Sequence, residues 1–209
     1  MFYRTDQPHG LRHNPFNALV VPRPIGWISS LDTAGRANLA PYSFFNAVAY
    51  QPPQVMFAAT GPHSAGGLKD TVENVRATGE FVCNLVTADL AEAMNLTSAA
   101  APRETDEFDV AGLTKAPSVL VAPPRVAESP AHLECRLVEI ATLRTTDPEA
   151  APNRLVIGEV VGIHIDDRIL VDGRVDMASM RPLSRLGYMD YAPVLEVFEM
   201  ERPSWPAVG

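Results

Sequence analysis

Closely spaced prolines divide this chain into short segments, and this feature limits the possible fold more than any other. Prolines stand in pairs or near-pairs at Pro22/Pro24, Pro52/Pro53 and Pro123/Pro124, among 19 prolines in 209 residues. Proline lacks a backbone N–H and clashes with the preceding helical turn, so each pair breaks a long helix. The pattern therefore argues against an all-helical bundle.

With 46% hydrophobic and 20% charged residues, the composition is that of a globular protein and excludes wholesale disorder.

The charge pattern argues against nucleic acid as a partner. The chain has 17 basic and 25 acidic residues, a net charge of −8, and no basic run. Phosphate backbones need clustered Lys and Arg. No apolar stretch approaches the roughly 20 residues of a membrane span, and the first six residues lack a signal-peptide pattern. We expect a cytoplasmic protein, and we expect Cys83 and Cys135 to be buried thiols in apolar runs rather than a disulfide.

The hydrophobic pattern predicts several strands and few helices. Strands are predicted over 26–31, 54–60, 80–86, 132–143, 155–165 and 194–200, with a hairpin over 169–173 and helices over 70–79 and 87–96. In the first of these helices Asp70 is the expected N-cap, Glu73 has capping-box spacing and Gly79 is the expected end. The order of these elements predicts a mainly β fold, a β-barrel with α additions. We expect one domain over 1–209, with its core at about 20–200.

Two long strands carry irregular features. In 132–143 the apolar alternation of Leu133, Cys135 and Leu137 shifts phase at Val138, which predicts a β-bulge or a sharp coil in the strand. In 155–165 one face carries glycines, which predicts close approach of another backbone or of a ligand.

The known short catalytic signatures are missing from the sequence. There is no GxSxG, HExxH or GxGxxG. His9 and His13 have the i, i+4 spacing of a metal pair, but no helix signal surrounds them, and a solvated N-terminal arm is the favoured interpretation. We therefore predict no metal site.

The loop over 61–71 is a candidate anion site because it leaves a predicted strand and enters a predicted helix. Backbone N–H groups at a helix start, together with Ser64, Lys69 and Thr71, suit a phosphate group. The loop is not a Walker A motif, because Leu68 separates the glycines from the lysine. The alternative is a plain loop with a surface lysine.

A second cluster, NLAPYSFF over 38–45, combines small residues with aromatic rings and polar tips. A flat heteroaromatic ligand needs such a wall, with backbone groups for its edge and apolar surface for its face. The alternative is that the aromatic residues belong to the core, and this is the favoured interpretation for Phe44 and Phe45 individually.

Several motifs in one order resemble the flavin reductase-like family of FMN-binding split β-barrels. They are RPIGWISS (23–30), NLAPYSFF (38–45), KDT (69–71), EFVCNL (80–85), DEF (106–108), IGEVVGIH (157–164) and PLSRLG (182–187). Each motif alone is modest, but their order over roughly 22–191 is specific for the family. It does not identify the substrate.

The resemblance implies a homodimer that holds FMN near the subunit interface. Together with the loop argument, it implies these cofactor-binding residues: Ser29, Ser30, Asn38, Leu39, Ala40, Pro41, Tyr42, Ser43, Ser64, Lys69, Asp70, Thr71, Arg185 and Tyr188. It places His164 near the nicotinamide or the flavin ring as the catalytic candidate. The sequence departs from the family at Tyr188, where many members have a second glycine, and at Ser30, where threonine is common.

The function implied is an oxidoreductase in which NADH or NADPH reduces bound FMN. The electrons then pass to free flavin, a partner oxygenase or another acceptor. Because the cofactor carries the chemistry, a catalytic triad is not required. One alternative is a non-catalytic FMN electron carrier, similar to flavoredoxin, without an NAD(P)H site. Another is a flavin-free split-barrel dimer with a structural or sensing role.

Overall fold

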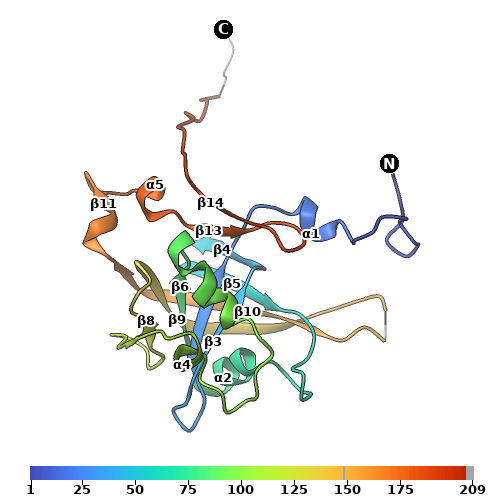
Figure 1. Cartoon of the computed structure of the whole chain (residues 1–209), viewed down its shortest axis with the longest axis horizontal. Coiled ribbons are helices and arrows are strands. Elements are labelled where there is room, and N and C mark those ends of the chain that lie inside the picture. Colours follow the sequence, from blue (N-terminus) through green and yellow to red (C-terminus); the bar gives the residue numbers. More distant parts are fainter. Residues whose placement is uncertain (148, 206–209) are drawn as a thin grey trace.

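A seven-stranded antiparallel sheet dominates the computed structural model, which describes residues 1–147 and 149–205 (Figure 1). The strand order is β3-β2-β6-β9-β10-β5-β4. These strands are β2 (Gly26–Leu31), β3 (Ala37–Tyr42), β4 (Phe45–Tyr50), β5 (Pro53–Ala59), β6 (Glu80–Leu85), β9 (Ala131–Leu143) and β10 (Asn153–Ile165). The predicted mainly β architecture with added helices is confirmed.

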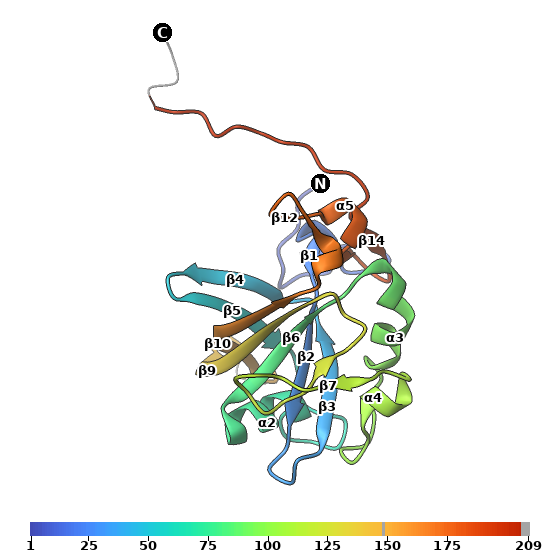
Figure 2. The same ribbon diagram turned by 90° about the vertical axis from the view of Figure 1, so that its left-hand side faces the viewer.

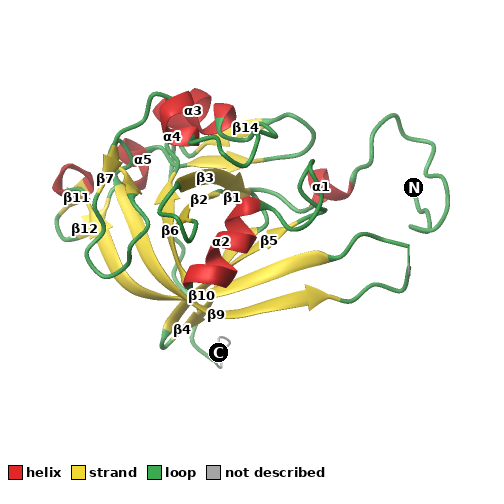
Figure 3. Cartoon of the chain, turned by 90° about the horizontal axis from the view of Figure 1, so that it is seen from below, coloured by secondary structure: helices red, strands yellow, loops and turns green. Residues whose placement is uncertain are grey.

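Smaller elements surround this sheet (Figure 3). A three-stranded sheet contains β1 (Arg23–Pro24), β13 (Leu183–Arg185) and β14 (Tyr191–Pro193), and two hairpins pair β7 (Lys115–Ala116) with β8 (Arg125–Val126) and β11 (Leu170–Val171) with β12 (Arg174–Val175). The helices are α1 (Phe16–Leu19), α2 (Asp70–Thr78), α3 (Ala91–Leu96), α4 (Glu107–Val110) and α5 (Met177–Met180), with 3-10 turns η1 (Ala88–Leu90) and η2 (Asp167–Ile169). No helix in the described ranges is long and apolar enough to cross a membrane.

Two hydrophobic clusters lie on opposite faces of β2. Ile28 packs in one cluster with Phe57 and Phe81, whereas its neighbour Trp27 packs in the other with Phe108. Successive side chains of a strand point to opposite faces, so β2 is buried on both sides. This burial explains its continuous run of apolar and small residues.

The predicted bulge in the long hairpin is confirmed. Ile157 pairs with Glu139 and Gly158 pairs with Leu137, so Val138 is the extra residue on β9. Gly158, one of the two glycines on β10, has a different role from the one expected. A Cβ at Gly158 would lie 2.3 Å from the Phe81 ring, so the close approach is made by a core side chain and not by a backbone or a ligand.

Helix α2 confirms the predicted helix but corrects its cap. Gly79 ends it in the left-handed conformation, with φ of 75°. The N-cap is Lys69, whose side chain makes no capping bond, and Asp70 is the first helical residue. The Asp70 carboxylate pairs with Arg103 instead of capping the helix.

The C-terminal region contradicts the predicted strand over 194–200. Ladder pairing stops with β14 at Pro193, and the following residues run away from the body of the protein (Figure 2). Leu195, Val197 and Phe198 are exposed. Alternation of apolar residues predicts a strand only where another strand lies alongside it to pair with, and this segment has left the sheet.

Candidate functional site

A cavity of about 370 Å³ lies where the end of β3 meets the loops over 60–71 and 97–101. Its volume falls within the usual range of small-molecule sites. The sequence-predicted residues that line it are Asn38, Ala40, Pro41, Tyr42, Ser43, Ser64, Lys69, Asp70 and Thr71. The two clusters singled out in the sequence, the wall over 38–45 and the loop over 61–71, therefore meet at one site.

One end of the cavity has the donors that an anion needs. The first backbone bonds of α2 run from the N–H groups of Val72 and Glu73 to the carbonyl of Lys69. The N–H groups of Asp70 and Thr71 lie before this ladder and carry the positive end of the helix dipole. With the Lys69 ammonium they form a suitable phosphate-binding group.

A polar network lies beneath the cavity. The Asn38 amide donates to Thr71 Oγ1 at 2.9 Å, and the Asn74 amide donates to Ser30 Oγ at 3.1 Å. Burial raises the pKa of Tyr42 to about 12, although a hydrogen bond with Thr71 opposes the shift. Tyr42 is therefore a neutral phenol, and the buried Thr71 hydroxyl is engaged within the protein rather than freely offered to a phosphate.

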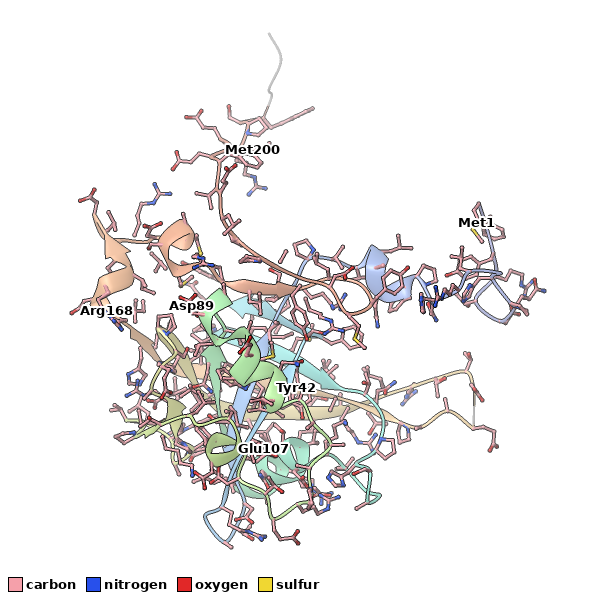
Figure 4. All side chains as sticks on the ribbon, in the orientation of Figure 1. Met1, Tyr42, Asp89, Glu107, Arg168 and Met200 are labelled. Carbon is pink, nitrogen blue, oxygen red and sulfur yellow. The ribbon has the colours of Figure 1, made fainter. Side chains whose placement is uncertain are left out.

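Glu107 lines the cavity, and its place in the DEF motif did not predict a role for it. Its carboxylate, carried by α4, accepts the N–H of Leu39 at 3.0 Å. Burial raises its pKa, because the carboxylate form is poorly solvated there. Figure 4 labels Glu107 and Tyr42 in the centre of the molecule.

Ser29, Ser30 and Leu39 lie close to the cavity but do not line it. Ser29 donates to the carbonyl of Pro124 at 2.6 Å, on the side of the sheet covered by the 114–130 loop. Ser30 belongs to the polar network, and Leu39 packs in the second core cluster. Neighbouring residues of one strand face opposite ways, so the two serine side chains cannot both face one ligand.

Arg185 and Tyr188 lie in the small sheet and its turn. The guanidinium of Arg185 stacks on Tyr191 at 4.4 Å and donates to the carbonyl of Tyr188. Tyr188 has φ of 56°, a left-handed backbone that favours glycine, which gives a physical reason for the double glycine of the family pattern. Neither residue lines the cavity in the described chain.

Arg23 connects this region to the cavity. Its guanidinium is buried and donates to the carbonyls of Asn17 at 2.6 Å, Val20 at 2.7 Å and Leu186 at 2.9 Å. It also reaches Ser43 Oγ at 3.4 Å. Burial, and the charge of Arg185, lower its pKa. Arg23 belongs to the RPIGWISS motif, but this role was not predicted, because its partners are backbone carbonyls and one of them, that of Leu186, lies far away in the sequence.

His164 lies in a different place from the flavin-type cavity. It lines a second cavity of about 420 Å³ together with Arg125, His132 and Asp166. Its Nε2 donates to Glu134 Oε1 at 2.5 Å, and its ring lies 6.0 Å from that of His132. Within one chain, therefore, His164 does not face the wall over 40–44.

Further residues of the first cavity were not predicted as site residues, although Phe44 and His63 lie within the two clusters singled out in the sequence. They are Asn17, Phe44, Ala58, Thr60, His63, Thr97, Ser98, Ala99, Ala100 and Ala101. Phe44 corrects the expectation of a core position, whereas Phe45 does pack against the core. The segment over 97–101 consists of small residues without a motif, and only the tertiary structure brings it opposite the α2 start.

The residues of the first cavity fit a flavin mononucleotide. Backbone groups and aromatic surface at Pro41–Phe44 suit the ring, and the α2 start with Lys69 suits the phosphate. The two carboxylates in the lining do not prevent this fit, since Asp70 is paired with Arg103 and Glu107 is held by the N–H of Leu39.

Comparison with known proteins agrees with this geometry. The family described as "Flavin reductase like domain" matches residues 18–180. An uncharacterized protein of Halalkalibacterium halodurans is 37% identical, over 88% of each chain. Nitrilotriacetate monooxygenase component B from Bacillus cereus is 31% identical with a TM-score of 0.85, over 96% of this chain and 98% of the other. Pseudomonas fluorescens 2-nitrobenzoate 2-nitroreductase is 26% identical with a TM-score of 0.81, over 98% and 97%.

The fold is thus shared over nearly the whole chain, and the expected split barrel is confirmed. The match covers the β3 wall, the α2 start and the long β9–β10 hairpin that together build the cavity and the sheet. This chain therefore belongs to the flavin reductase-like domain family.

Proposed function

We propose that the chain is an FMN-dependent oxidoreductase, cytoplasmic and homodimeric, in which NADH or NADPH reduces the flavin. The observation that carries this proposal is the meeting of the β3 wall with the start of α2 in one cavity. The names of two similar proteins, a monooxygenase component and a nitroreductase, support reductive chemistry and an oxygenase as a possible acceptor. Two free, buried cysteines fit a reducing compartment.

In the proposed mechanism the protein binds and orients, and FMN when bound supplies the ring that accepts a hydride. The N–H groups of Asp70 and Thr71 and the ammonium of Lys69 would hold the phosphate. The backbone over 40–44 would supply polar groups to the flavin, and the Tyr42 phenol stays neutral at physiological pH. The residues that line the cavity would exclude water from the bound flavin.

Substitution of Lys69 tests the cofactor site. Lys69→Ala is expected to weaken FMN binding by about ten- to a hundredfold, because a charge-assisted contact to phosphate contributes about 1.5–3 kcal/mol. Riboflavin lacks the phosphate, so its affinity should change far less. Flavin fluorescence titration measures both affinities, with Arg76→Ala as the control, since Arg76 is exposed on the same helix and pairs with Glu73.

If Lys69→Ala weakened the binding of FMN and riboflavin equally, Lys69 would support the fold in general. If it weakened neither, Lys69 would be a surface lysine without a role at the site. Heat release of the bound ligand followed by chromatography identifies the cofactor. FAD instead of FMN, or no flavin after reconstitution, contradicts the proposal.

The electron donor separates the proposed reductase from the second candidate, an FMN electron carrier without a nicotinamide site. Anaerobic mixing of the FMN-loaded protein with NADH or NADPH should bleach the flavin absorbance in a stopped-flow instrument. Bleaching only with a reduced protein donor favours the carrier. Protein without flavin colour favours the structural dimer.

The proposed homodimer is supported by the surface of the chain. The single chain exposes 13137 Å², whereas a compact monomer of its 22.7 kDa exposes about 9,500 Å². Strand β4 lies at the sheet edge, and its residues Val48 and Tyr50 are 49% and 87% exposed. Apolar residues of the arm over 195–205 are exposed as well. A second copy can cover such surfaces reciprocally across a two-fold axis.

Light scattering of the FMN-loaded protein at micromolar concentration is expected to give twice the mass of one chain, 22.7 kDa. Val48→Asp should weaken self-association by about tenfold or more, because it places a charge in an apolar interface. Val119→Asp is the matched control, since Val119 is 74% exposed on the 114–130 loop away from β4. A mass near that of one chain for the unmodified protein would contradict the dimer.

A further inference from the structure

One arginine outside the candidate cofactor cavity connects two of its walls. Arg103 lies on the loop between α3 and α4, just after the small residues that line the cavity. Its Nη2 donates to the carbonyls of Gly66 at 2.7 Å and Leu68 at 3.2 Å, and its Nη1 pairs with the Asp70 carboxylate. A single guanidinium thus holds three acceptors of the opposite wall, more than 30 residues away in sequence.

The held segment needs an external support. Gly66 and Gly67 both have positive φ, at 84° and 77°, so this part of the loop is a succession of left-handed residues with large conformational freedom in the unfolded chain. The same segment leads directly into Lys69 and the α2 start. A guanidinium suits the task, because its donors form a rigid planar fork that meets several acceptors in fixed directions.

The ion pair also changes the charge at the mouth of the phosphate site. Asp70 stands at the α2 start, where its carboxylate would repel a phosphate dianion. Arg103 pairs with one carboxylate oxygen, and His63 Nε2 lies 3.4 Å from the other. The negative charge that Asp70 brings to the cavity is thereby offset by the Arg103 guanidinium.

We propose that Arg103 is a positioning residue for cofactor binding. It fixes the segment over 66–70 to the wall over 97–101, and it thereby holds the α2 N–H groups and Lys69 in place for the FMN phosphate. It acts through the segment and not by its own contact with the cofactor. This inference rests on the proposed function, because it assigns a role within the same site.

The test compares Arg103→Ala and Arg103→Lys with the unmodified protein. Arg103→Ala is expected to weaken FMN binding by about tenfold and riboflavin binding by less than about threefold, since the phosphate end is the part that loses its support. Arg103→Lys should recover little, because an ammonium on a flexible stem cannot reproduce the fork. The double variant Arg103→Ala/Lys69→Ala should lose less FMN affinity than the product of the two single losses, because both residues act on the phosphate end of the ligand.

Hydrogen exchange of the flavin-free protein supplies a readout that does not need the cofactor. The amides of His63 and Gly66, which are hydrogen-bonded within this loop, should exchange faster in Arg103→Ala than in the unmodified protein, whereas Arg76→Ala, on α2, should leave them unchanged. If no variant, nor the unmodified protein, binds flavin, the proposed function fails, and faster exchange still supports the clamp. Unchanged exchange, equal losses of FMN and riboflavin, or full recovery by Arg103→Lys would overturn the positioning role.

Discussion

Glu134→Ala is expected to lower the free energy of unfolding by about 3–5 kcal/mol, the cost of removing one partner from a buried charged network. Glu134 is fully buried on β9. Its carboxylate accepts the N–H groups of Val119 at 2.8 Å and Leu120 at 2.6 Å, and Nε2–H of His164 at 2.5 Å. Its removal leaves these donors buried or poorly solvated, so the 114–130 loop loses its attachment to the sheet.

Equilibrium unfolding in urea, followed by the fluorescence of the buried Trp27, measures this loss. Glu139→Ala is the matched control, because Glu139 lies on the same strand and is exposed. Glu134→Gln keeps an acceptor oxygen, so its free energy of unfolding should lie between those of Glu134→Ala and Glu139→Ala. This variant preserves the test if Glu134→Ala does not fold. A loss below about 1 kcal/mol for Glu134→Ala would show that water replaces the carboxylate.

Acid is expected to destabilise the protein through His132. Burial, opposed by a hydrogen bond to the carbonyl of Val126 and assisted by the charge of Arg125, lowers the pKa of His132 to about 4. The unfolded chain takes up this proton near pH 6.5, whereas the folded chain resists it. The contribution of neutral His132 to the free energy of unfolding is therefore fully present above pH 6.5 and is lost as the pH falls toward 4. At pH 4 the loss reaches about 3 kcal/mol.

Urea unfolding at fixed protein concentration between pH 7 and pH 4 measures this slope. His132→Gln should reduce the decline by most of that amount, even if it lowers stability at pH 7. His13→Gln, a change at an exposed histidine, should leave the decline intact. Equal slopes for the unmodified protein and His132→Gln would mean that the carboxylates alone cause acid sensitivity.

Local sequence patterns predicted helix ends, bulges and turns where one or two residues determine the backbone conformation. Gly79 ends α2, and the phase shift at Val138 is the bulge that was expected. The hairpin at 169–173 forms with Asp172 and Gly173 both at positive φ. The strand expected over 194–200 was wrong, because pairing depends on a neighbour that local alternation cannot reveal.

The candidate site was predictable only where its residues are contiguous. The wall over 38–45 and the loop over 61–71 were both found from composition and position. Arg23, Arg103 and Glu107 were not, because each acts through backbone groups that the fold brings close from distant parts of the chain. Strand alternation also explains why Ser29 turns away from the cavity while Asn38 lines it.

The strand order has a consequence for how the chain folds. The early hairpins β2–β3 and β4–β5 lie at opposite ends of the sheet, and only β6, β9 and β10 join them. The last of these strands ends at Ile165. During synthesis the first hairpins must therefore wait, with their apolar faces uncovered, until more than three quarters of the chain has been made. Such non-local closure slows folding and makes the nascent chain a substrate for chaperones.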